Sequence, residues 1–337
     1  MKKPTLHLTN GLIVNTRLAE AGVEGTAVEW LDVLHEGPVP AGFGPAALRE
    51  RRAEFLASCG WGSFDTIARN LASRDEALEQ VSRFEEIVLW FEHDLFDQLQ
   101  LIQILDRVPF DELALRDVDS VPPLTAVLTT TYLGTEPPSR FPDLFAARRP
   151  VSSAERVAAR DAWEALRSYD PRAIADALPR VTALPSLAPA LRRHLQQFPS
   201  FANGLSRTEQ QTLEAVADGV RRVPDVYVRV NHEREEAIFM GDAPFLHHIR
   251  SLIEGTRPLL TAVPSELRYV SPLDGVSPQR PWHAGTLELT VDGVRVLAGE
   301  ADRVELCGID RWLGGVYLGG RGPVWRWDAA RETMRFV

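Results

Sequence analysis

Three short polar segments of the 337-residue chain hold side chains that can move protons. In the first, His35 is followed by Glu36, and Asp32 lies three residues earlier. An imidazole beside a carboxylate can act as a general base near neutral pH, because the acidic neighbour raises the affinity of the histidine for its proton. The alternative is that His35 hydrogen-bonds backbone carbonyls and fixes a loop that Gly37 and Pro38 stiffen, with Glu36 facing solvent.

The second segment has the densest group of polar side chains and follows a continuous apolar run. Here we expect His93 and Asp94, together with His35, to be the catalytic residues, His35 or His93 transferring protons and Asp94 orienting them. Glu92 and Asp97 are expected to contact a ligand. The alternative is structural: Asp94 stands where a helix N-cap belongs, Asp97 suits the helix dipole, and His93 is a satisfied, partly buried histidine.

The third segment is Asn10-Gly11, which follows a short apolar run and precedes a helical pattern. Helix starts expose unpaired N–H groups, so this turn can offer backbone donors and an amide side chain to a phosphate or carboxylate. The alternative is a tight turn with no ligand. The expected ligand-binding residues are Asn10, Gly11, Asp32, Glu36, Glu92 and Asp97.

Other kinds of site lack their usual spacing. His35, Glu36, His93 and Asp94 include the imidazole and carboxylate ligands that zinc, manganese or iron accept, but no H-E-x-x-H or similar motif supports them, so no metal site is predicted. The chain also lacks a G-x-G-x-x-G, a Walker motif and a G-x-S-x-G nucleophile elbow. Whether the protein is an enzyme, and with which cofactor, stays open.

The elements expected to position these residues alternate between strands and helices. Strands are predicted at 6–9, 26–30, 87–91 and 126–130, and helices at 12–21, 45–57, 64–84 and 95–108. This order predicts an α/β domain with an open parallel, Rossmann-like sheet. The carboxyl ends of its strands share one edge, where ligands bind in such folds, so the three polar segments are expected to converge there.

The remaining chain has a different pattern. Prolines follow the last strand, and helices are predicted at 152–167, 171–178 and 187–198, which indicates a helical connector. From Ser206 a capping box opens the first of three predicted helices, at 210–217, 224–231 (where a strand also fits) and 243–254, followed by strand pairs up to 298. This order resembles a winged helix, and a C-terminal hairpin is expected between 315–318 and 324–327. The predicted domains are 1–132, 133–203 and 204–337.

Composition limits the class of protein. Hydrophobic residues make up 45% and charged residues 25% of the chain, as in folded globular proteins. A formal net charge of −10 argues against a surface that grips nucleic acid as a whole. Two cysteines cannot form a disulfide framework, and no apolar run is long enough for a membrane span or signal peptide. We therefore expect a cytoplasmic location.

Three blocks of the first hundred residues follow the patterns H-x-x-N-G from His7, H-E-G-P-V from His35 and E-H-D-x-x-D-Q-L-Q from Glu92. Together they resemble a bacterial family of unknown function, and 309–315 and 324–328 resemble the distal part of its longer members. Leu12 is a departure, because many relatives carry an aspartate there. The resemblance supports the expected fold and implies no activity.

These features lead to one main hypothesis and its rivals. The first is a small-molecule or phosphorylated-ligand site in the first domain, with acid/base or hydrolytic chemistry. The second is a non-enzymatic regulator whose first domain senses a ligand and whose distal domain binds DNA or protein. The third is an interaction protein that binds no ligand. None of them involves a membrane.

Overall fold

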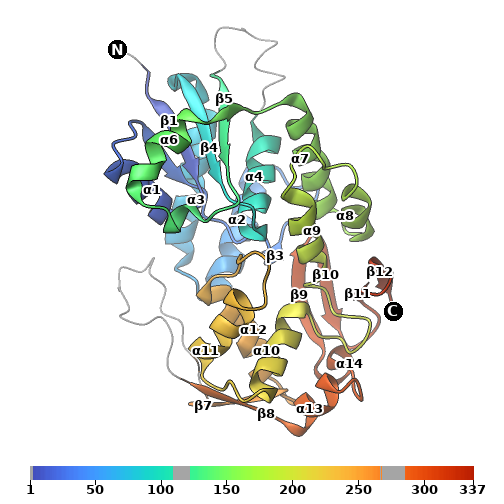
Figure 1. The fold of residues 1–337 in the computed structure, drawn as a ribbon. Coiled ribbons are helices and arrows are strands. Elements are labelled where there is room, and N and C mark those ends of the chain that lie inside the picture. The colour runs from blue at the N-terminus through green and yellow to red at the C-terminus, as the bar shows by residue number, and fades with distance from the viewer. Residues whose placement is uncertain (1–2, 109–121, 266, 268–284) are drawn as a thin grey trace. The chain divides into compact units, whose positions relative to one another are not determined.

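A computed structural model describes residues 3–108, 122–265, 267 and 285–337 (Figure 1). Backbone contacts divide the chain into two compact units. Unit 1 comprises Met1–Leu34, Ala68–Ala165 and Ala177–Ala190; unit 2 comprises His35–Ile67, Leu166–Asp176 and Leu191–Val337. Each unit is therefore assembled from separate stretches of sequence. The consecutive domain boundaries expected near 132 and 203 describe a different kind of division and stay predictions.

Unit 1 contains a five-stranded, mostly parallel sheet in the order β2-β1-β4-β5-β6. The four parallel strands are β1 (Thr5–Thr9), β2 (Thr26–Glu29), β4 (Glu86–Phe91) and β5 (Leu124–Leu128). The two-residue strand β6 (Arg149–Pro150) is antiparallel to β5. The expected parallel sheet is confirmed, although β5 lies two residues before the range predicted for it.

The helices around this sheet follow the apolar periodicity of the sequence. Unit 1 contains α1 (Leu12–Glu20), α4 (Leu95–Arg107), α6 (Phe141–Ala146) and the 3-10 turns η1 (Val81–Arg83), η3 (Leu133–Thr135) and η4 (Pro138–Arg140). Four further helices of the described residues cross a boundary between the units in sequence: α3 (Phe64–Glu79), α7 (Ser153–Arg167), α8 (Arg172–Ala177) and α9 (Leu187–Leu195). The helix predicted at 64–84 thus ends earlier and is followed by a 3-10 turn.

The core of unit 1 covers both faces of the sheet. Val14 of α1 and Phe141 of α6 pack with Trp90 of β4 on one face. Leu8 and Leu89 point to the opposite face and are also fully buried. Near-continuous apolar strands are the pattern that burial on both faces requires, and α4 packs against β4.

The described part of unit 2 contains three small sheets (Figure 1). The largest has the order β10-β9-β3, with β3 (Gly37–Pro38) parallel to β9 (Ile309–Gly314) and β10 (Val316–Gly320) antiparallel to it. The two antiparallel pairs are β7 (Leu260–Val263) with β8 (Thr286–Leu289), and β11 (Trp325–Asp328) with β12 (Thr333–Phe336). Strand β9 therefore joins the C-terminal sequence to a segment near residue 37.

Three of the helices described in unit 2 follow a residue whose side chain accepts from a backbone N–H of their first turn. The helices described within unit 2 are α2 (Pro45–Ser58), α10 (Arg207–Ala217), α11 (Val223–Tyr227) with a π-helical turn η5 (Val228–His232), α12 (Asp242–Ile253), α13 (Val291–Leu297) and α14 (Arg303–Cys307). The side-chain caps precede α10, α13 and α14. The expected capping box is confirmed: the Ser206 hydroxyl accepts from the Glu209 N–H, and the Glu209 carboxylate accepts from the Ser206 N–H.

Two sequence expectations for the distal region are wrong. Residues 291–297 form helix α13 rather than a strand, because the Thr290 side chain caps the helix by accepting from the Gly293 N–H. The predicted hairpin between 315–318 and 324–327 does not form either. Strand β10 pairs with the strand before it, since Gly314 adopts a φ of 59° and closes a tight turn, and β11 pairs with the strand after it.

The described residues therefore form a mixed α/β protein with a five-stranded, mostly parallel sheet. Within them, no helix combines the length and apolar character that crossing a membrane requires.

Candidate functional site

At the carboxyl edge of the unit 1 sheet, two of the predicted segments meet. Strands β1 and β4 are parallel neighbours with Thr9 opposite Trp90, so the residues that follow them lie close together. The Asn10 amide donates to both carboxylate oxygens of Asp97, at 3.1 and 3.0 Å, and the Glu92 N–H donates to the same carboxylate at 2.7 Å. The predicted convergence is thus observed for these three residues.

Asp97 belongs to a cluster of three buried carboxyl groups. Oxygens of Glu92, Asp94 and Asp97 all lie within 4.8 Å of one another. Burial raises the pKa of Asp94 to about 7, and the charge of Glu92 adds to the effect. Burial and the two neighbouring carboxylates raise the pKa of Asp97 well above its ordinary value. At neutral pH this cluster therefore retains protons.

Each of these acids also has a structural partner. Asp94 caps α4 by accepting from the Asp97 N–H at 3.2 Å, which confirms the capping alternative. Glu92 accepts from the Leu133 N–H at 2.7 Å. The three carboxylates are the only group of at least three metal-type ligands that the described residues bring together, and neither His35 nor His93 belongs to it.

The other predicted residues of unit 1 have local roles. Asp32 is buried and pairs with Arg74 at 3.3 Å. His93 is half-buried, its ring packs on Tyr132, and burial lowers its pKa. Gly11 precedes α1 with an extended φ of 167° and offers no side-chain cap. Catalytic or ligand-binding roles for these residues stay predictions.

His35 and Glu36 belong to unit 2, where their partners come from distant sequence. Glu36 is 1% exposed and accepts from His248 Nε2 at 2.8 Å and from Arg311 Nη2 at 2.9 and 3.2 Å. Burial would raise the pKa of Glu36, but the charges of Arg311 and His248 outweigh it and hold the pKa well below the ordinary value. The expectation that Glu36 faces solvent is therefore wrong.

His35 is buried beside this carboxylate. Its Nδ1 lies 3.8 Å from Glu36 Oε1, and its ring packs edge-on against Phe239. Burial lowers its pKa despite the adjacent acid. Gly37, which follows Glu36, has a φ of 78°, and a Cβ there would lie 2.2 Å from the Phe55 ring. Only glycine fits that position, so the turn that sets Glu36 in place depends on it.

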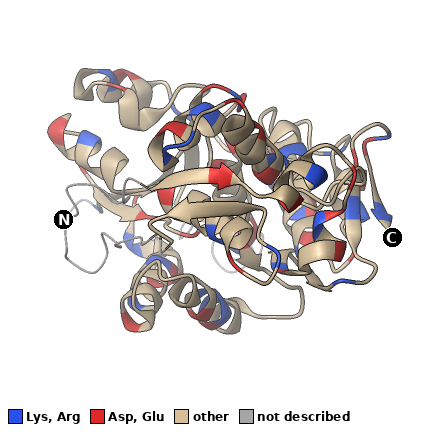
Figure 2. Cartoon of the chain, turned by 90° about the horizontal axis from the view of Figure 1, so that it is seen from below, with Lys and Arg blue, Asp and Glu red and all other residues tan. Residues whose placement is uncertain are grey.

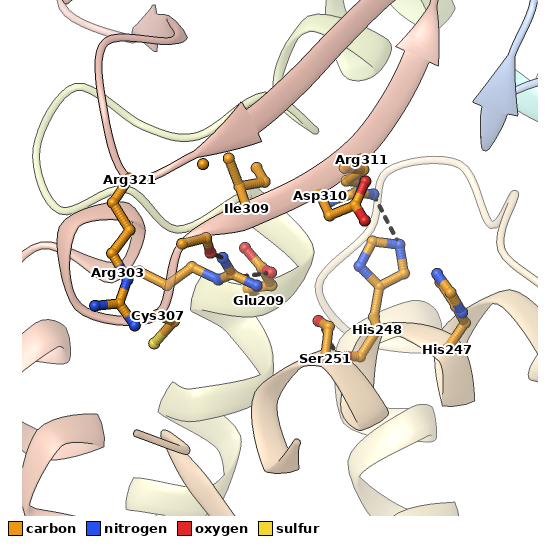
Figure 3. A pocket seen from close by; sticks show the side chains of 12 residues that line it. Glu209, His247, His248, Ser251, Arg303, Cys307, Ile309, Asp310, Arg311 and Arg321 are labelled. Atoms are coloured by element: carbon orange, nitrogen blue, oxygen red, sulfur yellow. Dashed lines mark hydrogen bonds and ion pairs between the residues drawn. The ribbon is translucent and has the colours of Figure 1, made fainter. Parts of the chain in front are cut away.

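A cavity of about 460 Å³ lies next to the ion pair that Glu36 forms (Figure 3). Helix α12, strand β9, the N-terminal part of α10 and the turns around α14 and after β10 supply its walls. The lining residues are Glu209, His247, His248, Ser251, Arg303, Cys307, Gly308, Ile309, Asp310, Arg311, Gly320 and Arg321. The volume is within the range of small-molecule sites.

The charges of the cavity are unevenly compensated. Arg303 pairs with Glu209 at 3.1 Å and donates to the Gly308 carbonyl at 2.8 Å. Arg311 is paired with Glu36, as described above. Arg321 is exposed, and its guanidinium has no hydrogen-bond or ion-pair partner among the described residues. Its aliphatic part lies against Gly308, so two arginines approach the same turn.

Figure 3 shows that the cavity has two chemically different ends. Arg303, Arg321 and Cys307 lie at one end. Asp310, Arg311 and His248 lie at the other, where the Asp310 carboxylate accepts from the Tyr317 hydroxyl at 3.1 Å. Burial raises the pKa of the Cys307 thiol, so this cysteine is not an activated nucleophile.

The sequence did not single out His248 or Arg311 as site residues. Arg311 lies in the 309–315 block that carries the family resemblance, but 275 residues separate it from Glu36, and 212 separate Glu36 from His248. The parallel pairing of β3 with β9, with Gly37 opposite Leu313, brings these segments together. Such a pairing between a two-residue strand and a distant one leaves no local pattern.

No protein-family model matches the chain, and no curated protein matches it. The resemblance of the three blocks to a bacterial family therefore stays a prediction.

Proposed function

We propose that this protein binds a small phosphorylated molecule in the cavity of unit 2. One observation carries the proposal: arginines from three separate segments, Arg303, Arg311 and Arg321, line one cavity of about 460 Å³. Guanidinium groups suit phosphate because their fixed N–H donors match its oxygens. The sequence pointed to a phosphorylated ligand in the first domain, and this proposal keeps the ligand class and moves the site.

The uncompensated end of the cavity favours an anion. Arg321 has no acidic partner in the described chain, and Arg303 shares its charge with Glu209. A phosphate placed between them would receive charge-assisted hydrogen bonds, each contributing about 1.5–3 kcal/mol. Both arginines contact the turn at Gly308, which has a φ of 77°: Arg303 donates to its carbonyl, and the Arg321 side chain lies against it.

The opposite end favours a hydrogen-bond donor on the ligand. Asp310 is exposed and its carboxylate can accept only, and His248 contributes an imidazole beside it. A ligand with a phosphate at one end and hydroxyl or amino groups at the other matches both ends. Sugar phosphates and nucleoside monophosphates have this chemistry.

The test is ligand-induced stabilisation of the full chain. We expect ribose 5-phosphate or a nucleoside monophosphate to raise the melting temperature, and unphosphorylated ribose to leave it unchanged. Arg321→Ala should weaken binding about tenfold or more, because it removes at least one charge-assisted bond. Arg229→Ala is the matched control, since its 40%-exposed side chain pairs with Glu233 and does not line the cavity.

Two results would contradict the proposal. One is stabilisation by phosphorylated compounds that Arg321→Ala and Arg229→Ala reduce equally, which would indicate a general charge effect. The other is no stabilisation by any phosphorylated compound at millimolar concentration.

A second candidate is a ligand-sensing regulator with a winged helix. The order of α10, α11 and α12 followed by the β7–β8 pair, with a bridge between Arg222 and Thr286, supports this topology. The parallel sheet of unit 1 likewise supports a Rossmann-like arrangement. However, α12, the third helix, lines the cavity through His247, His248 and Ser251, so part of its surface is already used.

Charge also bears on this second candidate. Figure 2 shows Lys and Arg interspersed with Asp and Glu rather than gathered alone on one element. DNA readers usually concentrate basic residues on one face. A docking site for protein therefore fits unit 2 better than a site for DNA. A gel-shift experiment at low salt with the full chain tests this, because retention of DNA that salt abolishes would reverse the preference.

A further inference from the structure

We infer that Glu36 and His248 form a proton-transfer pair for the ligand in the cavity, with Nδ1 of His248 as the atom that takes up and releases the proton. The inference rests on the proposed function, because it requires a ligand in this cavity. Glu36 is a positioning residue in this pair, whereas His248 lines the cavity and would touch the ligand.

The hydrogen bonds determine which nitrogen of His248 carries a proton. Nε2 lies 2.8 Å from Glu36 Oε1 and 3.0 Å from Arg311 Nη2. An ionised carboxylate can only accept, so a lone pair on Nε2 would face the lone pairs of Oε1 at this distance. Arg311 Nη2 can only donate, so its contact alone would place the lone pair on Nε2. The carboxylate contact is the shorter of the two, and Arg311 Nη2 also donates to Glu36 at 2.9 and 3.2 Å. We therefore assign the proton to Nε2 and the lone pair to Nδ1.

Nδ1 lies on the cavity side of the ring. In Figure 3 the dashed contact leaves one side of the His248 ring, and the other nitrogen points into the space between Glu209 and Ser251. The Ser251 hydroxyl does not donate to this nitrogen, because its Oγ donates to the backbone carbonyl of His248 at 2.8 Å. A base is thus held at the wall of the cavity by a fixed partner.

The chemistry is a proton transfer without a change of oxidation state. An O–H or N–H bond of the ligand breaks and leaves its electron pair on the oxygen or nitrogen, while an N–H bond forms at Nδ1. The resulting imidazolium is stabilised by Glu36, and the new negative charge on the ligand lies near Arg311. The reverse step returns the proton, so the pair can act as base and then as acid.

Charged groups from every neighbouring element act on His248. They come from the β3 segment (His35 and Glu36), α10 (Glu209), α12 (His247), α14 (Arg303) and β9 (Asp310 and Arg311). Three acids of this set, Glu36, Glu209 and Asp310, are balanced by Arg303, Arg311 and the third arginine of the cavity, Arg321. Uptake of a proton leaves a positive excess that an anionic ligand offsets, so binding and proton uptake should be linked.

The first experiment needs no ligand. Nitrogen NMR of the full chain with labelled histidine, assigned with His248→Gln, reports the protonation of each ring nitrogen. We expect neutral His248 to carry its proton on Nε2 and a lone pair on Nδ1, and Glu36→Gln to redistribute the proton between the two nitrogens. A proton on Nδ1 in the unaltered protein would overturn the inference, because no base would then face the cavity.

The second experiment separates this inference from the proposed function. Calorimetric titration with ribose 5-phosphate in buffers of different ionisation enthalpy measures protons taken up on binding. We expect uptake in the unaltered protein and in the exposed-residue control His232→Gln, and its loss in His248→Gln. Binding with equal proton uptake in His248→Gln would overturn the proton-transfer role alone. Absence of binding in every variant would instead overturn the proposed function and leave the NMR result standing.

Discussion

Glu36 in unit 2 and Asp97 in unit 1 are both carboxyl groups with 1% exposure, yet their pKa values shift in opposite directions. Glu36 faces Arg311 and His248, whose charges outweigh the effect of burial. The hydrogen bonds to Asp97 come from the Asn10 amide and a backbone N–H, and the neighbouring charges are two more acids. Among the described residues, no arginine or lysine pairs with that cluster.

The difference shows that the identity of a polar residue at a strand end does not determine its chemistry. Neutral donors allow Asp97 to stay protonated, which makes its cluster a structural junction of β1, β4 and α4. A guanidinium makes Glu36 a permanent anion that can orient an imidazole. Each environment predicts a distinct response to mutation and to pH.

The largest effect should come from breaking the charge compensation in unit 2. Arg311→Met leaves the buried Glu36 carboxylate without its guanidinium, and loss of one partner of a buried pair costs about 3–5 kcal/mol. Urea unfolding followed by circular dichroism at pH 7 measures the loss. Arg51→Met is the control, because Arg51 is 47% exposed and lies 3.8 Å from Glu54. Equal stability of the two variants would show that the pairing does not hold Glu36 ionised.

The unit 1 cluster should respond to pH in the opposite way to a paired acid. Because the folded pKa of Asp94, about 7, lies above its unfolded value near 4, stability is greatest below pH 4 and is lost as the pH rises to about 7. Asp94→Asn mimics the protonated acid and retains a good N-cap, so it should remove up to about 4 kcal/mol of that pH dependence.

Urea midpoints of the unaltered protein and Asp94→Asn between pH 4 and 8 test this prediction. The two curves should converge at low pH and separate as the pH rises, with the variant relatively more stable at pH 8. Parallel curves would show that the pKa of Asp94 is the same in the folded and unfolded chain, which would contradict the prediction.

Local patterns explain what the sequence predicted correctly. The capping box at Ser206 and the cap at Asp94 each depend on residues three positions apart, and the apolar run at 87–91 needs only its own composition to indicate a buried strand. The meeting of Asn10 with Asp97 followed from the rule that parallel strands end at one edge.

Non-local pairing explains what the sequence missed. Nothing near Glu36 indicates that strand β9 will lie beside it. The glycines at 319, 320 and 322 favoured a hairpin turn there, whereas β10 pairs with the strand that precedes it. The hypothesis of one site therefore combined segments that the structure distributes over two units: Glu36 binds His248 and Arg311, and Asn10 binds Asp97. Charge complementarity across hundreds of residues is a property of the folded chain alone.

The smallest of the three effects is a loss of stability at acid pH, and it comes from a buried histidine of unit 2. His194 is fully buried in unit 2 beside His35, Glu36, Arg193 and Arg311, and burial lowers its pKa to about 3. An unfolded histidine takes up a proton near pH 6.5, so the stability that the neutral ring contributes is complete above that pH and is lost as the pH falls toward 3.

The free energy of unfolding of His194→Leu should therefore rise by about 2 kcal/mol relative to that of the unaltered protein between pH 8 and pH 5, because leucine binds no proton on unfolding. The exposed His232→Leu controls for removal of one imidazole. Because Asp94 weakens the fold on raising the pH and His194 on lowering it, the two variants should tilt the pH profile in opposite senses. If His194→Leu and His232→Leu follow the same profile, His194 is solvated in solution, and the dry, charge-balanced interior ascribed to unit 2 is incorrect.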